Sequence, residues 1–229
     1  MLTQPHAVLF LGELLHFGYN SLCANAVELD SMSSCGCGGK KMNITLRNAV
    51  LQQVQQQHGG VQHLGRAAQA FAAQVQKDAI GPGGTALAAF FTALAGAVGS
   101  ADKMSIDDFA VAIASTAKTD NENAKASSDQ PDQGSVRLQA VIRSSCSALT
   151  ANQARFSTAC YTSLSSLLLK WSRTVQAAVD KEEAAGVKEV YIVRSSKAAA
   201  PPPAAAAAQD SDVVAFKLLV TGMRAGAKG

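Results

Sequence analysis

The segment LDSMSSCGCGGKKMN, residues 29–43, holds three glycines and two cysteines. Glycine and serine are weaker helix formers than alanine or leucine, so this composition predicts a break in helical structure. On both sides of the segment apolar residues recur at helical spacing, over 7–28 before it and over 42–57 after it. This periodicity predicts a helix on each side of a loop.

The same periodicity predicts six further helices. They cover 61–77, 85–98, a segment that starts after Ser105, 135–149, 151–185 and 212–223. The GPGG sequence at 81–84 predicts a strong break, and the polar residues 119–133 predict a loop. Ser163 and Ser166 are expected to bend the long 151–185 helix, and residues 187–193 favour either a short strand or the start of another helix.

The composition favours one all-helical domain. Of 229 residues, 48% are hydrophobic and only 5% are aromatic, while alanine and leucine dominate. We therefore predict an all-α fold in a single domain over 1–229, with the low-complexity alanine and proline segment 197–209 as an extended spacer before the last helix. Short loops make sequential helices antiparallel neighbours, which fits either an up-and-down barrel or an irregular bundle.

Apolar side chains on one face of three predicted helices are the expected core. They are Leu11, Leu14, Leu15 and Leu22 in the first helix, Phe109, Ile113 and Ala117 after Ser105, and Leu164, Leu167, Leu168 and Trp171 in the long helix. Asp107 and Asp108 fall in the first turn of a predicted helix, so they are expected to stabilise that helix rather than to act as acid–base groups.

Charge and cysteine usage exclude several classes of protein. The net charge of +3 comes without any run of lysine or arginine, which argues against a nucleic-acid partner. No apolar stretch reaches the roughly 18 residues that span a bilayer, so we predict no membrane span. The five cysteines are odd in number and irregularly spaced, unlike a secreted disulfide framework. The expected location is intracellular, cytoplasmic or organellar.

Several stretches resemble, in order, the nucleotide-binding L-subunit domain of dihydroxyacetone (glycerone) kinases. In that family a helix ending in Leu-Asp is followed by a Gly-Asp-x-Asp-His-Gly loop and then by Met, as in residues 29–43. Residues 64–71, the glycine-rich 81–84 and residues 134–138 follow in the family's order. The resemblance spans nearly the whole chain and implies an eight-helix antiparallel up-and-down barrel with ADP or ATP at one end.

The resemblance also implies a lost magnesium site. Asp30 stands at the family's first metal-binding aspartate, whereas Cys35 and Cys37 stand at the other two and Gly38 replaces a histidine. Magnesium requires oxygen ligands, while thiolates suit zinc, copper(I) or iron–sulfur centres. We therefore predict a vestigial Asp30 and no bound metal or cofactor. Cys35-Gly36-Cys37 is interpreted either as a metal or redox site or as two tolerated loop residues.

A vestigial phosphate-binding region is predicted from two glycine-rich stretches. Its candidate residues are Gly38, Gly39, Lys40, Lys41, Gly83 and Gly84. Backbone N–H groups and lysines that open a helix favour an anion, although the same residues suit a solvated basic turn. The family's Gly-Ser-Ser-Gly loop has lost both serines here, and Pro82 has no N–H to donate.

Two functions follow as hypotheses. The first is a catalytically inactive member of this family that acts as a structural or regulatory subunit of a larger protein assembly. The alternative is the ATP- or ADP-binding subunit of a dihydroxyacetone kinase, using Mg²⁺ and working with a separate chain that carries the substrate-binding K domain. Under either hypothesis the expected partner is a protein.

Overall fold

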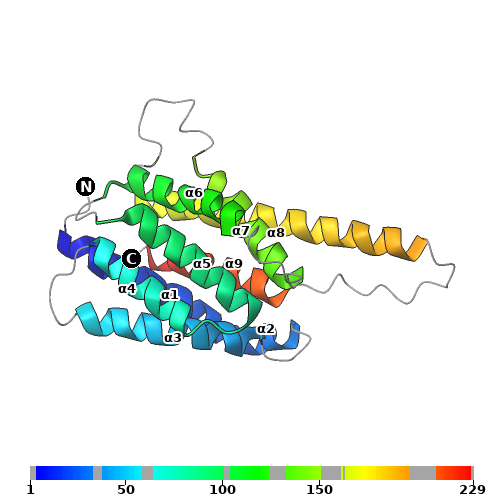
Figure 1. The fold of residues 1–229 in the computed structure, drawn as a ribbon, viewed down its shortest axis with the longest axis horizontal. Helices are drawn as coiled ribbons and strands as arrows, with labels where there is room; N and C mark the ends of the chain where they lie inside the picture. Colours follow the sequence, from blue (N-terminus) through cyan, green and yellow to red (C-terminus); the bar gives the residue numbers. More distant parts are fainter. Residues whose placement is uncertain are drawn as a thin grey trace.

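The computed structural model describes residues 4–32, 38–57, 64–100, 104–123, 133–150, 161, 163–195 and 210–227. Within these residues every regular element is an α-helix, which confirms the all-α prediction (Figure 1). The helices are α1 Gln4–Ala24, α2 Ala26–Met32, α3 Gly38–Gln57, α4 Leu64–Lys77, α5 Gly81–Val98, α6 Ile106–Asn123, α7 Gln133–Ser147, α8 Leu164–Ser195 and α9 Ser211–Gly226. None of the helices in this part of the chain combines the length and apolarity needed to cross a bilayer.

The helices pack in chain order. Helix α1 packs on α3, each helix from α3 to α8 packs on the next one in the chain, and α9 returns to pack on α1. Helix α2 is an addition that packs mainly on α3 and also contacts α9. Glycine contacts give the direction of two pairs: Gly65 near the start of α4 abuts Gly99 after the end of α5, and α1 crosses α9 with opposite polarity. Because α9 packs on α1, the first and the last helix of the chain are neighbours in space.

Two glycines allow α9 to close against α1. A Cβ added at Gly222 would lie 2.6 Å from the Phe17 carbonyl oxygen and 2.9 Å from Cα of Gly18. A Cβ added at Gly18 would lie 2.7 Å from Cδ1 of Leu219. These separations are well below ordinary van der Waals contact, so the two backbones approach as closely as they do only because both positions lack a side chain.

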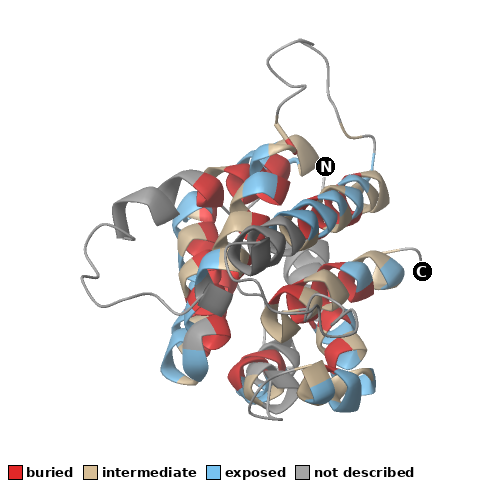
Figure 2. Ribbon diagram, turned by 90° about the vertical axis from the view of Figure 1, so that its right-hand side faces the viewer, coloured by how far each residue is buried: buried red, intermediate tan, exposed pale blue. Residues whose placement is uncertain are grey.

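An aromatic cluster lies in the core. Phe90 of α5 lies 6.1 Å from Trp171 of α8 and 5.9 Å from Phe216 of α9, measured between ring centroids. Phe91 extends the cluster to Phe71 of α4, at 4.8 Å in an edge-to-face arrangement. Such aromatic pairs stabilise a core beyond the area that they bury. Figure 2 shows that the buried residues lie mainly on the inward faces of the helices.

The predicted core residues are largely confirmed. Buried members are Leu14, Leu15, Leu22, Phe109, Ile113, Ala117, Leu167, Leu168 and Trp171. Leu164 is partly buried and packs against this core. The side chain of Leu11 lies outside the described residues. The agreement follows from the 3.6-residue period, which places the apolar stripe of each helix on its core face.

The helix predicted over 7–28 was wrong in extent, because two helices occupy this part of the chain. Asn25 separates α1 from α2: its side-chain Nδ2 donates to the Ser21 carbonyl at 2.8 Å, and its own carbonyl accepts from the Leu29 N–H at 3.0 Å. An asparagine side chain that bonds to nearby backbone competes with helix continuation. The described residues therefore hold nine helices rather than the predicted eight.

The GPGG sequence opens α5 instead of separating it from α4, so the predicted 85–98 boundary was wrong. Ile80 is extended and precedes the helix, Gly81 has φ of 69°, and Pro82 lies in the first turn. Proline suits this turn because the N–H groups there have no intrahelical partner. The positive φ at Gly81 is a conformation that favours glycine.

The structure also corrects the predictions for α6, α7 and α8. Residues 119–123 are helical and end α6, and α7 starts at Gln133, so the predicted loop 119–133 was wrong at both ends; residues 124–132 lie outside the described residues. Ser163 directly precedes α8 and caps it instead of bending a helix: its Oγ accepts from the Ser166 N–H at 3.1 Å, and its N–H donates to Ser166 Oγ at 3.2 Å. This reciprocal pair is a capping box. Residues 151–160 of the predicted helix lie outside the described residues. Residues 187–193 are helical, which excludes the strand, and the tract 197–209 lies outside the described residues.

Candidate functional site

The starts of α3, α5 and α9 meet at one end of the fold, toward the right in Figure 1. We name residues 81–84, together with Lys41, Thr45 and Asp212, the glycine-turn site. At this site Lys41 and Thr45 of α3 lie beside Gly81 and Gly84 of α5, respectively. Asp212 of α9 lies beside Gly83. Free N–H groups at a helix start carry partial positive charge, so this arrangement concentrates positive potential at one end.

Thr45 sets the position of α5 on α3. Its hydroxyl is fully buried, donates to the Lys41 carbonyl at 3.0 Å and accepts from the Ile80 N–H at 3.2 Å. A Cβ added at Gly84 would lie 2.9 Å from this hydroxyl oxygen. Thr45 therefore satisfies the backbone group that precedes α5, and Gly84 permits the close approach.

Lys41 lies beside the first residue of α5. A Cβ placed on Gly81 would lie 3.5 Å from Cδ of Lys41 and 3.9 Å from its Nζ. The side chain thus runs along the glycine turn, and its ammonium group adds a full positive charge to the partial charge of the helix start. Cationic and N–H groups together favour an anion at this position.

Asp212 supplies the negative charge at the site. A Cβ added at Gly83 would overlap Cγ and a carboxylate oxygen of Asp212, so the carboxylate of α9 packs directly against α5. Asp210 holds the start of α9 in place, because its Oδ1 accepts from the Asp212 N–H at 3.0 Å. The carboxylate therefore lies within the first turn of its own helix and against the first turn of α5, where negative charge is favoured at both.

The remaining predicted site residues fall on the same or neighbouring elements. Residues 38–41 form the first turn of α3, and Asp30 lies in α2, which packs on both α3 and α9. Cys35 and Cys37 lie outside the described residues. Among the side chains that are described, no three histidine, cysteine, aspartate or glutamate groups gather closely enough to hold a metal ion.

Two residues of the glycine-turn site were missed from the sequence. Thr45 sits between apolar neighbours in α3, and a threonine at a core position of a predicted helix was a usable signal for a buried hydrogen bond. Asp212 was recognised only as the start of the last helix. Its contact with Gly83 joins residues far apart in the chain, and helical periodicity carries no information about such pairs.

Asp107 and Asp108 have structural partners. Asp108 Oδ2 accepts from Ser105 Oγ at 2.6 Å, while Ser105 Oγ accepts from the Asp108 N–H at 3.0 Å, which is a capping box at the start of α6. Asp107 Oδ1 accepts from the Tyr161 N–H at 3.1 Å. The Asp108 carboxylate thus caps the start of α6, as the sequence predicted, whereas the Asp107 carboxylate joins α6 to the backbone at Tyr161.

Tyr19 of α1 is a partly buried side chain with a raised pKa. Burial, followed by a hydrogen bond with Cys23 one turn along α1, raises the pKa of Tyr19 to about 12, against an opposing effect of Arg47. The phenol therefore stays neutral at physiological pH. It lies on α1 and takes no part in the glycine-turn site.

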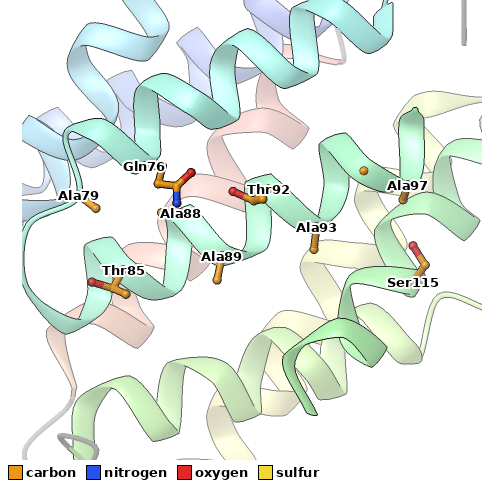
Figure 3. A pocket seen from close by; sticks show the side chains of 10 residues that line it. Gln76, Ala79, Thr85, Ala88, Ala89, Thr92, Ala93, Ala97 and Ser115 are labelled. Atoms are coloured by element: carbon orange, nitrogen blue, oxygen red, sulfur yellow. The ribbon is translucent and has the colours of Figure 1, made fainter. Parts of the chain in front are cut away.

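A separate open groove of about 710 Å³ lies on α5 between α4 and α6 (Figure 3). Alanine side chains of α5 form much of it, and its polar groups are Gln76, Thr85, Thr92 and Ser115. Among the described residues its lining includes no charged side chain, so these residues offer it no acid–base group.

Comparison of the chain with family models and with curated proteins finds no match in either. The geometry of the glycine-turn site and the motifs of the sequence therefore carry the functional argument.

Proposed function

We propose that the chain is a non-catalytic relative of the dihydroxyacetone kinase L domain that serves as a structural or regulatory subunit of a larger assembly. In this proposal α1 and α3 to α9 are the eight helices of an antiparallel up-and-down barrel, and α2 is an addition. The observation that supports this proposal is that three motifs, separate in the sequence, lie at the same end of the fold. The turn at 81–84, the first turn of α3 and the helix that bears Asp30 all belong to one end of a set of helices packed in chain order.

The ligand chemistry of that end supports inactivity. Phosphoryl transfer depends on a divalent cation that neutralises the charge on the phosphates. Sulfur stands where the family has carboxylate oxygen at Cys35 and Cys37, and a soft thiolate is a poor ligand for magnesium. Pro82 removes one N–H from the turn, and the Asp212 carboxylate adds a negative charge beside it.

A coupled-enzyme assay tests the proposal. The purified chain, mixed with a substrate-binding K-type subunit, dihydroxyacetone and ATP, is expected to give no phosphoryl transfer with or without magnesium. The matched variant carries Cys35→Asp and Cys37→Asp together with Asp212→Ala, which removes the carboxylate beside Gly83, and magnesium-dependent ADP binding by this variant in calorimetry is expected if the barrel end is intact. Magnesium-dependent turnover by the unmodified chain contradicts the proposal.

A nucleotide-binding subunit is the second candidate, and one observation favours it. The Lys41 ammonium lies beside the start of α5, where an ATP or ADP phosphate is attracted. Calorimetry of the unmodified chain with ATP and with ADP, each with and without Mg²⁺, separates the candidates. Heat of binding that depends on Mg²⁺ supports the second candidate, whereas its absence supports the first.

A further inference from the structure

Asp212 contacts a helix other than its own. It belongs to α9, yet its carboxylate fills the space beside Gly83, a buried residue in the first turn of α5. Residue 83 lies close enough to the carboxylate that even a methyl group would overlap it. The fold therefore places one specific negative group against this turn, and any side chain at position 83 requires the Asp212 carboxylate to move.

The surroundings explain why a carboxylate is stable there. The start of α5 presents backbone N–H groups at Gly81 and Gly83, the Lys41 ammonium lies beside Gly81, and the dipole of α5 has its positive end at this turn. Asp210 caps α9 through the Asp212 N–H, which limits how far the Asp212 backbone can move. An anion is favoured at this place, and the chain supplies its own.

We propose that Asp212 is a built-in anion that closes the glycine-turn site to external phosphate. An incoming phosphate would meet both the volume and the charge of the carboxylate, and two negative groups at one helix start repel each other. The contact is thus autoinhibitory, and loss of the Asp212 charge opens the site. This inference rests on the proposed function, because it explains how a turn that resembles a phosphate loop can be closed in a non-catalytic subunit.

A double-mutant cycle tests the contact itself. Gly83→Ala is expected to lower the Tm of the full chain by several degrees, because the new methyl group meets the carboxylate. In the Asp212→Ala background the same substitution is expected to raise the Tm by a few degrees, because alanine favours a helix over glycine. A fall in Tm of equal size in both backgrounds would overturn the proposal.

Phosphate binding tests the autoinhibition. The Tm is measured in sodium phosphate and in sodium chloride of the same ionic strength. The unmodified chain is expected to show only the non-specific stabilisation that phosphate gives any folded protein, whereas the Tm of Asp212→Ala rises by several degrees more in phosphate, and adding Lys41→Met removes this extra rise. Asp212→Asn, which keeps the shape and removes the charge, provides a second variant should Asp212→Ala not fold, and it is expected to show a smaller gain.

The outcomes separate this inference from the proposed function. A phosphate-dependent gain in the unmodified chain as large as that of Asp212→Ala refutes autoinhibition, as does no extra rise in either Asp212 variant. Phosphoryl transfer by the unmodified chain in the coupled assay refutes the proposed function, and the Tm cycle at positions 83 and 212 remains readable in that case.

Discussion

Closure of α9 on α1 depends on Gly222, and Gly222→Ala is the sharpest test of the fold. The added Cβ would lie 2.6 Å from the Phe17 carbonyl oxygen and 2.7 Å from Cβ of Ser21. Reaching a normal separation of 3.4 Å from the carbonyl oxygen requires a displacement of 3.4 − 2.6 = 0.8 Å between the two helices. The obstructing atom is backbone, so no rotamer change relieves the overlap.

The change in the free energy of unfolding caused by Gly222→Ala is the sum of two opposing effects. Overpacking a well-packed interface costs about 1–3 kcal/mol. Replacing glycine by alanine inside a helix returns roughly 0.5–1 kcal/mol through the backbone. Gly96→Ala in α5 is the matched control, because a Cβ there meets nothing within 4 Å and its backbone is helical. The control should receive the favourable effect alone, so Gly222→Ala should be less stable than Gly96→Ala by about 1–3 kcal/mol.

Urea unfolding followed by circular dichroism measures this difference, with thermal melting as a second readout. For a chain of this size each kcal/mol corresponds to about 2–4 °C in Tm, so the two variants should differ by roughly 2–12 °C. Equal stability of Gly222→Ala and Gly96→Ala would refute the close approach of α1 and α9. A native-like spectrum of both variants at 10 °C serves as the control for folding.

Three further substitutions test local features of the fold. Thr45→Val removes the hydrogen bond that ties Ile80 to α3 and the one that the hydroxyl donates to the Lys41 carbonyl, and it should cost about 1–3 kcal/mol in unfolding free energy. Thr85→Val at the exposed start of α5 serves as its control and should cost less. Ser105→Ala removes the cap of α6 and should cost about 0.5–2 kcal/mol by urea titration; no loss there contradicts the capping box. Because the pKa of Tyr19 is raised to about 12, its contribution to stability is complete below pH 10 and falls between pH 10 and 12. Tyr19→Phe should flatten the stability-versus-pH curve in this window, and an unchanged slope argues against the raised pKa of this partly buried phenol.

Assembly with a protein partner is also testable. Ile44 and Leu51 lie two turns apart on the outer face of α3 and are each about half exposed, and Val27 of α2 is 85% exposed. If a partner covers this face, the native mass of the protein from its source cells should exceed 23.6 kDa, and Ile44→Lys with Leu51→Lys should return it to the mass of the single chain. Lys substitution at the exposed Val111 of α6 is the matched control, and an equal effect there excludes α3 as the contact face.

The sequence by itself determined the helical class and most of the core. Both follow from local information, because the 3.6-residue period and the dominance of alanine and leucine act within each helix. Leu14, Leu22, Ile113 and Trp171 were identified as core residues for this reason, and all four are buried. Errors occurred at helix boundaries, where a capping side chain or a glycine with positive φ decides where the helix begins or ends.

Tertiary structure alone decided which helix ends meet. The contacts of Gly222 with Phe17, of Thr45 with Ile80 and of Gly83 with Asp212 each join segments far apart in the chain. They depend on close approach between two backbones or on one buried polar group, and neither feature produces a periodic pattern in the sequence. From the local sequence alone, glycine predicts a break in a helix. In α5 and α9, however, glycine is the residue that lets one helix lie against another.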